Sequence, residues 1–399
     1  MGAKLAKIRS RLGWVSGYGG LQLVSLVGQF LISYFVIVYS SQYIWGEVVS
    51  CLIVLNLAAM LCNWGQNTYL LREFSKTPMN IAQLWQESFT TRLVFFVATG
   101  LIFLFLYKDD FELYIYLCLW LFAIFIIRSV EPLNLYFRAF KWLIFLECIS
   151  LAIFGVLFYW SIDNISPLLL VKLYVIWSWF RALGYLVFYK KTIFSVLKWR
   201  FSLMFLKGAF PFFIPAMVGF VQSRIDLYGV AYYLPKKTLG EYQIFFKYLM
   251  LFIVGLRIVI SPFLKTIYRL PFKSLTRLSK QAFLAGIFLT GPIIIALYFI
   301  LPWVYGIRFS VYLYIAGYLM LVPFFGYALQ THLLIKHHLE TKMAWGFFWG
   351  ACCNLICNYL LIPTYGALGA IISTAIVQWL LLIGFSYLVK TIRINNEVT

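Results

Sequence analysis

The feature that most restricts the fold of this 399-residue chain is a succession of long apolar stretches that recurs from one end to the other. A helix needs about 20 apolar residues to cross the hydrocarbon core of a bilayer. Because a backbone in lipid must satisfy its own hydrogen bonds, we expect each stretch to be helical. We predict twelve spans, over residues 18–40, 48–71, 92–107, 113–130, 142–160, 167–189, 210–233, 242–264, 282–300, 309–330, 344–362 and 367–389.

The placement of charge gives these spans a direction. The chain is 63% hydrophobic and only 12% charged, yet its net charge is +20. Most of the lysines and arginines fall in alternate connections between the spans, which is the pattern of the positive-inside rule. The positive charge is therefore a topology signal and does not indicate nucleic acid as a partner. Both termini are expected in the cytoplasm.

The spans divide into two sets of six. The basic connection 190–207 separates them, so we predict an N-terminal bundle over 1–189, this cytoplasmic linker, and a C-terminal bundle over 208–399. Two halves that both start inside imply a pseudo-twofold axis along the membrane normal, with the ligand site between them. The predicted fold class is all-α integral membrane, with about twelve transmembrane helices in two pseudo-symmetric six-helix bundles around a central cationic cavity.

The seventh span, 210–233, carries Arg224 and Asp226 near its middle. A charge at mid-bilayer costs about 2.5–3.5 kcal/mol, so such residues usually face protein or a water-filled cavity. Pro211 and Pro215 weaken the same helix just before the charges. This span therefore predicts the wall of a transport path.

Other spans also contain ionisable residues, and cations predominate among them. Two lysines lie near the outer ends of their helices, where a long side chain can reach the membrane surface. The remainder either form interhelical ion pairs that fix packing, or serve a ligand. The excess of cations favours an anionic ligand, because uncompensated charge is unstable in a low dielectric. The set is Glu147, Lys172, Arg181, Arg224, Asp226, Lys247 and Arg257.

The first two spans carry amides at roughly helical spacing, Gln22 and Gln29 on one and Asn56, Asn63 and Asn67 on the other. Such spacing places side chains on one helix face. The amides either hydrogen-bond between helices as packing contacts or line a path for a polar ligand.

Sequence patterns for catalysis are lacking. The chain has no Walker A, HExxH or GxSxG motif and no CxxC pair. His332, His337 and His338 fall in a predicted connection without the spacing of a zinc site. We expect a transporter and not an enzyme, with no catalytic residue, no cofactor and no metal.

A family resemblance is carried by three groups of residues, which are Asn354, Asn358, Pro363, Gly366, Gly369 and Ser373-Thr374 near the C-terminus, Pro211, Asp226, Gly240 and Ser261-Pro262 in the middle, and Gly46 and Arg72 near the N-terminus. In these residues the chain resembles the Wzx-type O-antigen or polysaccharide flippases of the multidrug/oligosaccharidyl-lipid/polysaccharide exporter superfamily. The resemblance implies alternating-access transport of an undecaprenyl-pyrophosphate-linked oligosaccharide, an O-antigen or capsule repeat unit. The direction implied is from the cytoplasmic to the periplasmic leaflet of the bacterial inner membrane.

The resemblance also assigns roles to the residues above. Pyrophosphate would be the missing anion, bound by Arg224, Arg257 and Arg181. Asp226 would serve in ion coupling or in an ion pair. The amides of the first two spans would contact the glycan. The implied partners are the lipid-linked substrate, membrane lipid and other proteins of polysaccharide (lipopolysaccharide) assembly.

Two other functions remain open. A multidrug exporter of the same fold would export organic cations and is expected to have an acidic cavity. A membrane polysaccharide polymerase would be an enzyme, expected to carry a large outer loop, whereas the predicted outer connections here are short.

Overall fold

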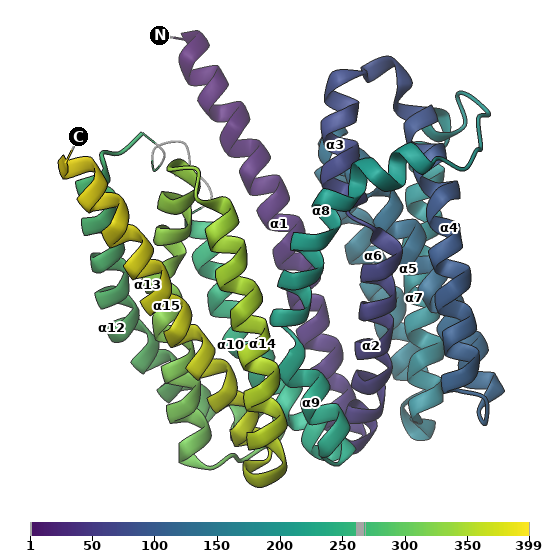
Figure 1. Cartoon of the computed structure of the whole chain (residues 1–399). Coiled ribbons are helices and arrows are strands. Elements are labelled where there is room, and N and C mark those ends of the chain that lie inside the picture. The colour runs from purple at the N-terminus through teal and green to yellow at the C-terminus, as the bar shows by residue number, and fades with distance from the viewer. Residues whose placement is uncertain (1, 261–266, 268, 399) are drawn as a thin grey trace. The chain divides into compact units, whose positions relative to one another are not determined.

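The computed structural model describes the backbone of residues 2–260, 267 and 269–398, and their side chains except those of 2–16, 18, 22, 257–259 and 393–398. All elements assigned within these residues are helices (Figure 1). Twelve of the described helical segments are long and apolar enough to cross a membrane. The predicted class of a twelve-span helical membrane protein is confirmed.

The chain forms two compact units, the first ending at Met217 and the second beginning at Val218. The boundary falls inside helix α8, and the predicted linker 190–207 lies wholly within the first unit. The helices of the first unit are α1 (Gly2–Tyr39), α2 (Gln42–Asn63), α3 (Gln66–Lys76), η1 (Pro78–Asn80), α4 (Ile81–Leu106), α5 (Phe111–Phe137), α6 (Phe140–Trp160), η2 (Ile162–Asn164), α7 (Pro167–Ile193) and most of α8 (Leu203–Gln222). The second unit contains α9 (Ile225–Tyr233), α10 (Lys236–Ile260), α12 (Phe272–Tyr305), α13 (Val311–Lys336), α14 (Glu340–Tyr365) and α15 (Ala367–Val398).

Several predicted ends are wrong because the helices continue beyond their apolar cores. Helix α1 begins at Gly2, and α4 begins at Ile81 within a segment that we expected to be a connection. Hydropathy marks where a helix meets lipid, not where its backbone hydrogen bonds stop. Side-chain caps mark three other starts: Ser41, Asp110 and Ser166 accept hydrogen bonds from the first turns of α2, α5 and α7.

The predicted second span is not one continuous helix, because α2 and α3 are separated by Trp64 and Gly65, both in the left-handed region. A Cβ on Gly65 would lie 2.6 Å from the backbone nitrogen of Phe213 in α8, so only glycine fits. The Trp64 ring stacks between Phe95 and Phe213, with 4.4 Å between centroids on each side. At this break, the first half of α8 therefore packs against the rest of the first unit.

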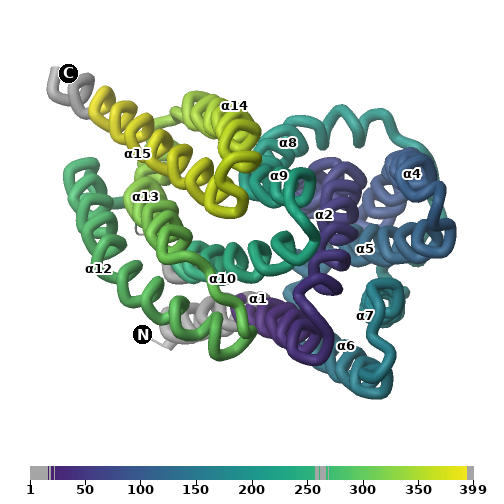
Figure 2. The backbone as a smooth tube through the Cα atoms, turned by 90° about the horizontal axis from the view of Figure 1, so that it is seen from below, coloured from purple at the N-terminus to yellow at the C-terminus, as the bar shows by residue number. Residues whose placement is uncertain are grey.

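In the second unit, α13 is the central helix, and both α12 and α15 pack along it (Figure 2). Helix α14 packs on α15, and the short α9 packs on α14. Buried residues of α13 such as Met320 and Leu321 form the core that these neighbours share.

The two units repeat a tryptophan contact. The indole of Trp179 on α7 donates to the carbonyl of Leu119 on α5 at 3.1 Å, and Trp379 on α15 donates to the carbonyl of Leu319 on α13 at 3.0 Å. Each pair is separated by the same interval, and the second pair comes 200 residues after the first. This repeat supports the predicted pseudo-symmetry and gives the register between the halves.

Candidate functional site

The predicted seventh span breaks at its charged residues and not at its prolines. Pro211 and Pro215 lie inside α8, which runs to Gln222, and α9 begins at Ile225. Arg224 occupies the N-cap position of α9 and is half-buried, with its guanidinium 5.5 Å from the centre of the Phe220 ring. The expectation of a weakened helix is confirmed, with the break moved to Arg224.

Asp226 lies in the first turn of α9 and is only 1% exposed. Its Oδ2 accepts a hydrogen bond from the hydroxyl of Tyr242 on α10 at 2.5 Å. Its Oδ1 is buried and accepts no well-formed hydrogen bond from the described residues. This carboxylate therefore retains a site for a proton or a cation.

Helix α14 brings two buried asparagines alongside α9. A Cβ on Gly350 would lie 3.5 Å from Nε2 of Gln222, and a Cβ on Gly229 would lie 3.8 Å from Cβ of Asn358. Helix α14 therefore packs along α9. Asn358 donates from Nδ2 to Oδ1 of Asn354 at 3.1 Å, and its own Oδ1 is buried without a donor among the described residues.

The sequence marked these asparagines only as part of a family resemblance, and their position on the helix that packs against α9 was not predicted. Ser373 and Thr374 on α15 are also buried, and α15 packs on α9. A signal was available in the sequence, because Asn354 and Asn358 are four apart and so share one helix face.

Arg181 is held by a carboxylate of its own unit. Its Nε lies 2.8 Å from Oε2 of Glu147, which is 1% exposed. The guanidinium also lies 4.9 Å from the centre of the Trp177 ring. In the register of the repeat, Phe347 and Leu381 take the places of this pair in the second unit. The contact favours the ion-pair alternative for Arg181.

Lys172 also has an acidic partner, as Nζ lies 2.8 Å from Oε1 of Glu112 in the first turn of α5. Our count of charges in the spans left out Glu112, which offsets this lysine. The side chain of Arg257, the third predicted phosphate ligand, lies outside the described residues.

A buried cation on α4 was missed altogether. Arg92 is 0% exposed, and its guanidinium donates to Oγ of Ser88, Oγ of Ser129 and the carbonyl of Cys62. Cys62 lies in the last turn of α2, where the helix dipole favours a positive charge. Hydropathy placed Arg92 at the edge of a span, although α4 begins eleven residues earlier, at Ile81.

The predicted amide stripe of the second span is divided by the break. Asn63 is buried at the end of α2, and Asn67 on α3 donates to Oε2 of Glu131 on α5 at 2.7 Å. Asn56 donates to the carbonyl of Leu52 in its own helix. Gln29 is exposed, and the side chain of Gln22 lies outside the described residues. Asn67 therefore makes a packing contact between helices, with Glu131 as a partner that the sequence analysis did not identify.

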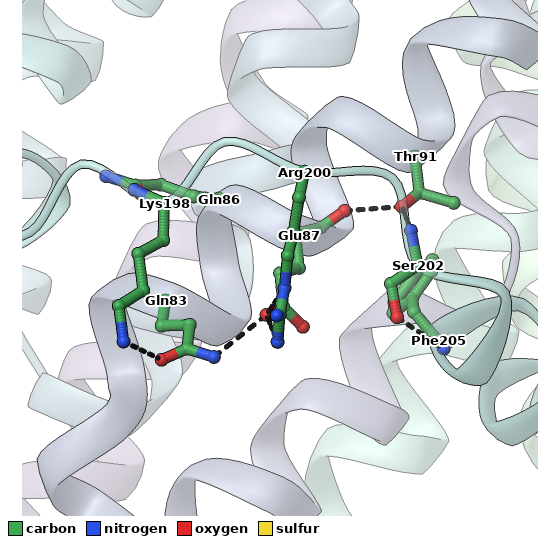
Figure 3. Close-up of polar contacts among 8 residues, drawn as sticks. All are labelled: Gln83, Gln86, Glu87, Thr91, Lys198, Arg200, Ser202 and Phe205. Atoms are coloured by element: carbon green, nitrogen blue, oxygen red, sulfur yellow. Dashed lines mark hydrogen bonds and ion pairs between the residues drawn. The ribbon is translucent and has the colours of Figure 1, made fainter.

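The segment between α7 and α8 is fixed to α4 (Figure 3). Arg200 donates from Nε to Oε1 of Glu87 at 2.7 Å, and the backbone N–H of Ser202 donates to Oγ1 of Thr91 at 2.9 Å. The amide of Gln86 accepts from the backbone N–H of Lys198. These contacts explain why the basic linker belongs to the first unit.

Comparison with solved structures identifies the fold. The model matches "Lipid II flippase MurJ, inward closed conformation" with a TM-score of 0.67 and 15% identity, over 95% of this chain and 87% of that chain. It matches an inward-facing multidrug resistance MATE family transporter of the MOP superfamily with a TM-score of 0.59 and 13% identity, over 94% and 91%. The chain therefore has the fold of these two solved structures. No family model and no curated protein matches the chain by sequence.

Proposed function

We propose that this protein is a Wzx-type flippase that moves undecaprenyl-pyrophosphate-linked oligosaccharide from the cytoplasmic to the periplasmic leaflet of the bacterial inner membrane. The fold supports transport, and one of the solved structures with this fold is a lipid II flippase. The observation that carries the choice of an anionic substrate is the pairing of the carboxylates. Glu147, Glu87 and Glu131 are each bound to a protein cation or amide.

The proposed binding group for the pyrophosphate is Arg224. It stands at the N-terminus of α9, where the helix dipole favours an anion. Guanidinium binds phosphate oxygens through two parallel hydrogen bonds, which lysine cannot reproduce. Arg257 is proposed as its companion on α10. Arg181 is a weaker candidate for binding the pyrophosphate than the sequence indicated, because Glu147 already neutralises its charge.

Asp226 is the proposed coupling group. Its buried Oδ1 and the buried Oδ1 of Asn358 lie on two helices that run side by side. Two oxygens without donors are costly to bury, and a proton or monovalent cation would satisfy them. Ion coupling at Asp226 would add to the membrane potential as a driving force, but flipping does not require it.

A multidrug exporter is the second candidate, because the MATE transporter shares the fold over 94% of the chain. Such a protein would bind an organic cation through a carboxylate, and Asp226 is the available group. Its full burial and its bond to Tyr242 count against a role in binding a large cation.

The deciding experiment reconstitutes the purified protein in liposomes with an undecaprenyl-pyrophosphate-linked oligosaccharide. A glycosidase added outside would report the fraction of glycan exposed, compared with liposomes that lack the protein. We expect flipping by the wild type and its loss in Arg224→Ala. Efflux of organic cations without glycan exposure would favour the exporter and refute the flippase.

A further inference from the structure

A cavity of about 420 Å³ lies inside the second unit, between α12 and α15 and over α13. It is lined by the beginning of α12 and the ends of α13 and α15, so it lies near the membrane surface on the side of the C-terminus. Phe283 and Leu382 meet at its inner end, over Gly326. A Cβ on Gly326 would lie 2.7 Å from Leu382 Cδ1 and 3.0 Å from Phe283 Cδ2, so glycine lets these two side chains meet.

The charged groups that line the cavity are all positive. The lining includes Lys280 from α12 and Lys390 from α15, and it includes no carboxylate. Gln330 on α13 donates from Nε2 to Oγ of Ser386 at 2.9 Å. Its Oε1 is buried without a donor among the described residues. Such an oxygen needs a hydrogen-bond donor, which a hydroxyl group of a ligand can supply.

The hydroxyls of Thr276 and Ser279 also line the cavity, and each donates to a backbone carbonyl. The remaining walls are supplied by leucine, valine and phenylalanine side chains. A ligand that fits must therefore combine a negative charge and a hydroxyl at one end with a hydrocarbon chain at the other. None of the residues predicted to contact the transported substrate lines this cavity.

We propose that the cavity is a binding site for an anionic phospholipid of the surrounding membrane, of the phosphatidylglycerol class. The phosphate lies between Lys280 and Lys390, a headgroup hydroxyl donates to Oε1 of Gln330, and one acyl chain runs inward toward Phe283 and Leu382. Lysine side chains at a helix end reach the level of lipid phosphates while their stems stay in apolar surroundings. The bound lipid fills the wedge between α12 and α15 and stabilises the second unit, whatever the protein transports.

Native mass spectrometry of the delipidated, full-length protein tests this proposal. The protein is titrated with phosphatidylglycerol and, separately, with phosphatidylcholine of the same acyl chains. We expect one phosphatidylglycerol to bind well below the concentration at which phosphatidylcholine binds. Each lysine near an anionic lipid contributes about fivefold in affinity, so Lys280→Ala/Lys390→Ala is expected to bind about 25-fold more weakly.

Two further variants separate a site from general attraction to a basic surface. Lys273→Ala/Lys342→Ala removes two exposed lysines of α12 and α14 that do not line the cavity, and it is expected to bind as the wild type does. Ser386→Trp keeps both lysines and fills the cavity, and it is expected to lose the bound lipid. Unchanged thermal unfolding without added lipid shows that each variant folds.

Three results would overturn the proposal. Equal binding of phosphatidylcholine would remove the role of the charge. An equal loss in the Lys273→Ala/Lys342→Ala control would indicate surface attraction only. Binding of a polyprenyl phosphate in place of phosphatidylglycerol, lost in Ser386→Trp, would assign the cavity to the tail of a transported lipid.

Discussion

The pair of Arg181 and Glu147 offers a test of whether a buried charge serves packing or substrate. Glu147 is 1% exposed and the Arg181 side chain is 18% exposed, so the two ends of the pair are not equivalent. Removing one partner of a buried pair typically costs about 3–5 kcal/mol, because the other charge is left uncompensated. Arg181→Leu leaves the fully buried carboxylate and is expected to fall in this range. Glu147→Leu leaves a cation that can still reach water and is expected to cost less.

Removing both charges is expected to restore stability. The second unit has Phe347 and Leu381 at the corresponding positions, so this fold accepts apolar residues there. Replacing a buried pair by apolar residues of similar volume is often neutral or stabilising by about 1–4 kcal/mol. We expect the free energy of unfolding of Glu147→Leu/Arg181→Leu to lie within about 1 kcal/mol of the wild-type value. Thermal unfolding in detergent measures the difference.

The same variants give the functional answer in the flipping assay. If Arg181 serves packing only, the double variant flips the lipid-linked oligosaccharide at the rate of the wild type. If the double variant is stable but inactive, Arg181 contacts the substrate. A double variant as unstable as Arg181→Leu would refute the inference from the repeat, because the site would then need its charges for folding.

The remaining predictions concern the site, the break, the driving force and the topology. Arg224→Ala is expected to abolish flipping while the protein is still present at its normal abundance, and normal flipping by this variant would reject the phosphate role. Lys172→Ala is expected to reduce flipping only slightly, because its pair with Glu112 lies at a helix end. Gly65→Ala is expected to lower the free energy of unfolding by more than about 1 kcal/mol, because alanine is strained at positive φ and its Cβ would clash with the backbone of α8. Gly100→Ala is the control and is expected not to destabilise the protein, because a Cβ there would have no neighbour within 4 Å. An inside-negative potential of about 100 mV favours the outward movement of two negative charges by about 4–5 kcal/mol, so a potassium-diffusion potential alone is expected to drive flipping. Dependence on an ion gradient that is lost in Asp226→Asn would contradict this and assign the coupling to Asp226. Reporter fusions are expected inside at Lys198, Lys273 and the C-terminus, and outside at Asp110, Asp163 and Tyr365, and an outside C-terminus would contradict the twelve-span topology.

Hydropathy was sufficient to predict the twelve spans, because burial in lipid imposes the same requirement on each of them. It was not sufficient for the ends, since helices such as α4 continue past the apolar core into polar turns. The break at Trp64 and Gly65 was not predictable either, because its cause is the backbone of Phe213, far away in the sequence. Local composition cannot report a contact of that range.

The candidate site was predicted in part for a related reason. Arg224 and Asp226 stand out because charges are costly inside an apolar stretch. Asn354 and Asn358 are uncharged, and an amide in a span is as well explained by packing. Arg92 was missed because hydropathy placed it at the edge of a predicted span, and its neutral partners give no sign in the sequence that it is buried.

The repeat separates what the fold requires from what this chain adds to it. The indole contacts of Trp179 and Trp379 occur in both units, so they belong to the shared architecture. The Glu147–Arg181 pair has an apolar counterpart in the second unit, which makes it a feature of one unit only. Asp226 and Tyr242 likewise belong to the second unit alone. Because a symmetric scaffold gains nothing in packing from placing buried charges differently in its halves, these differences are where selection for transport is expected to act, and they are the positions to vary first.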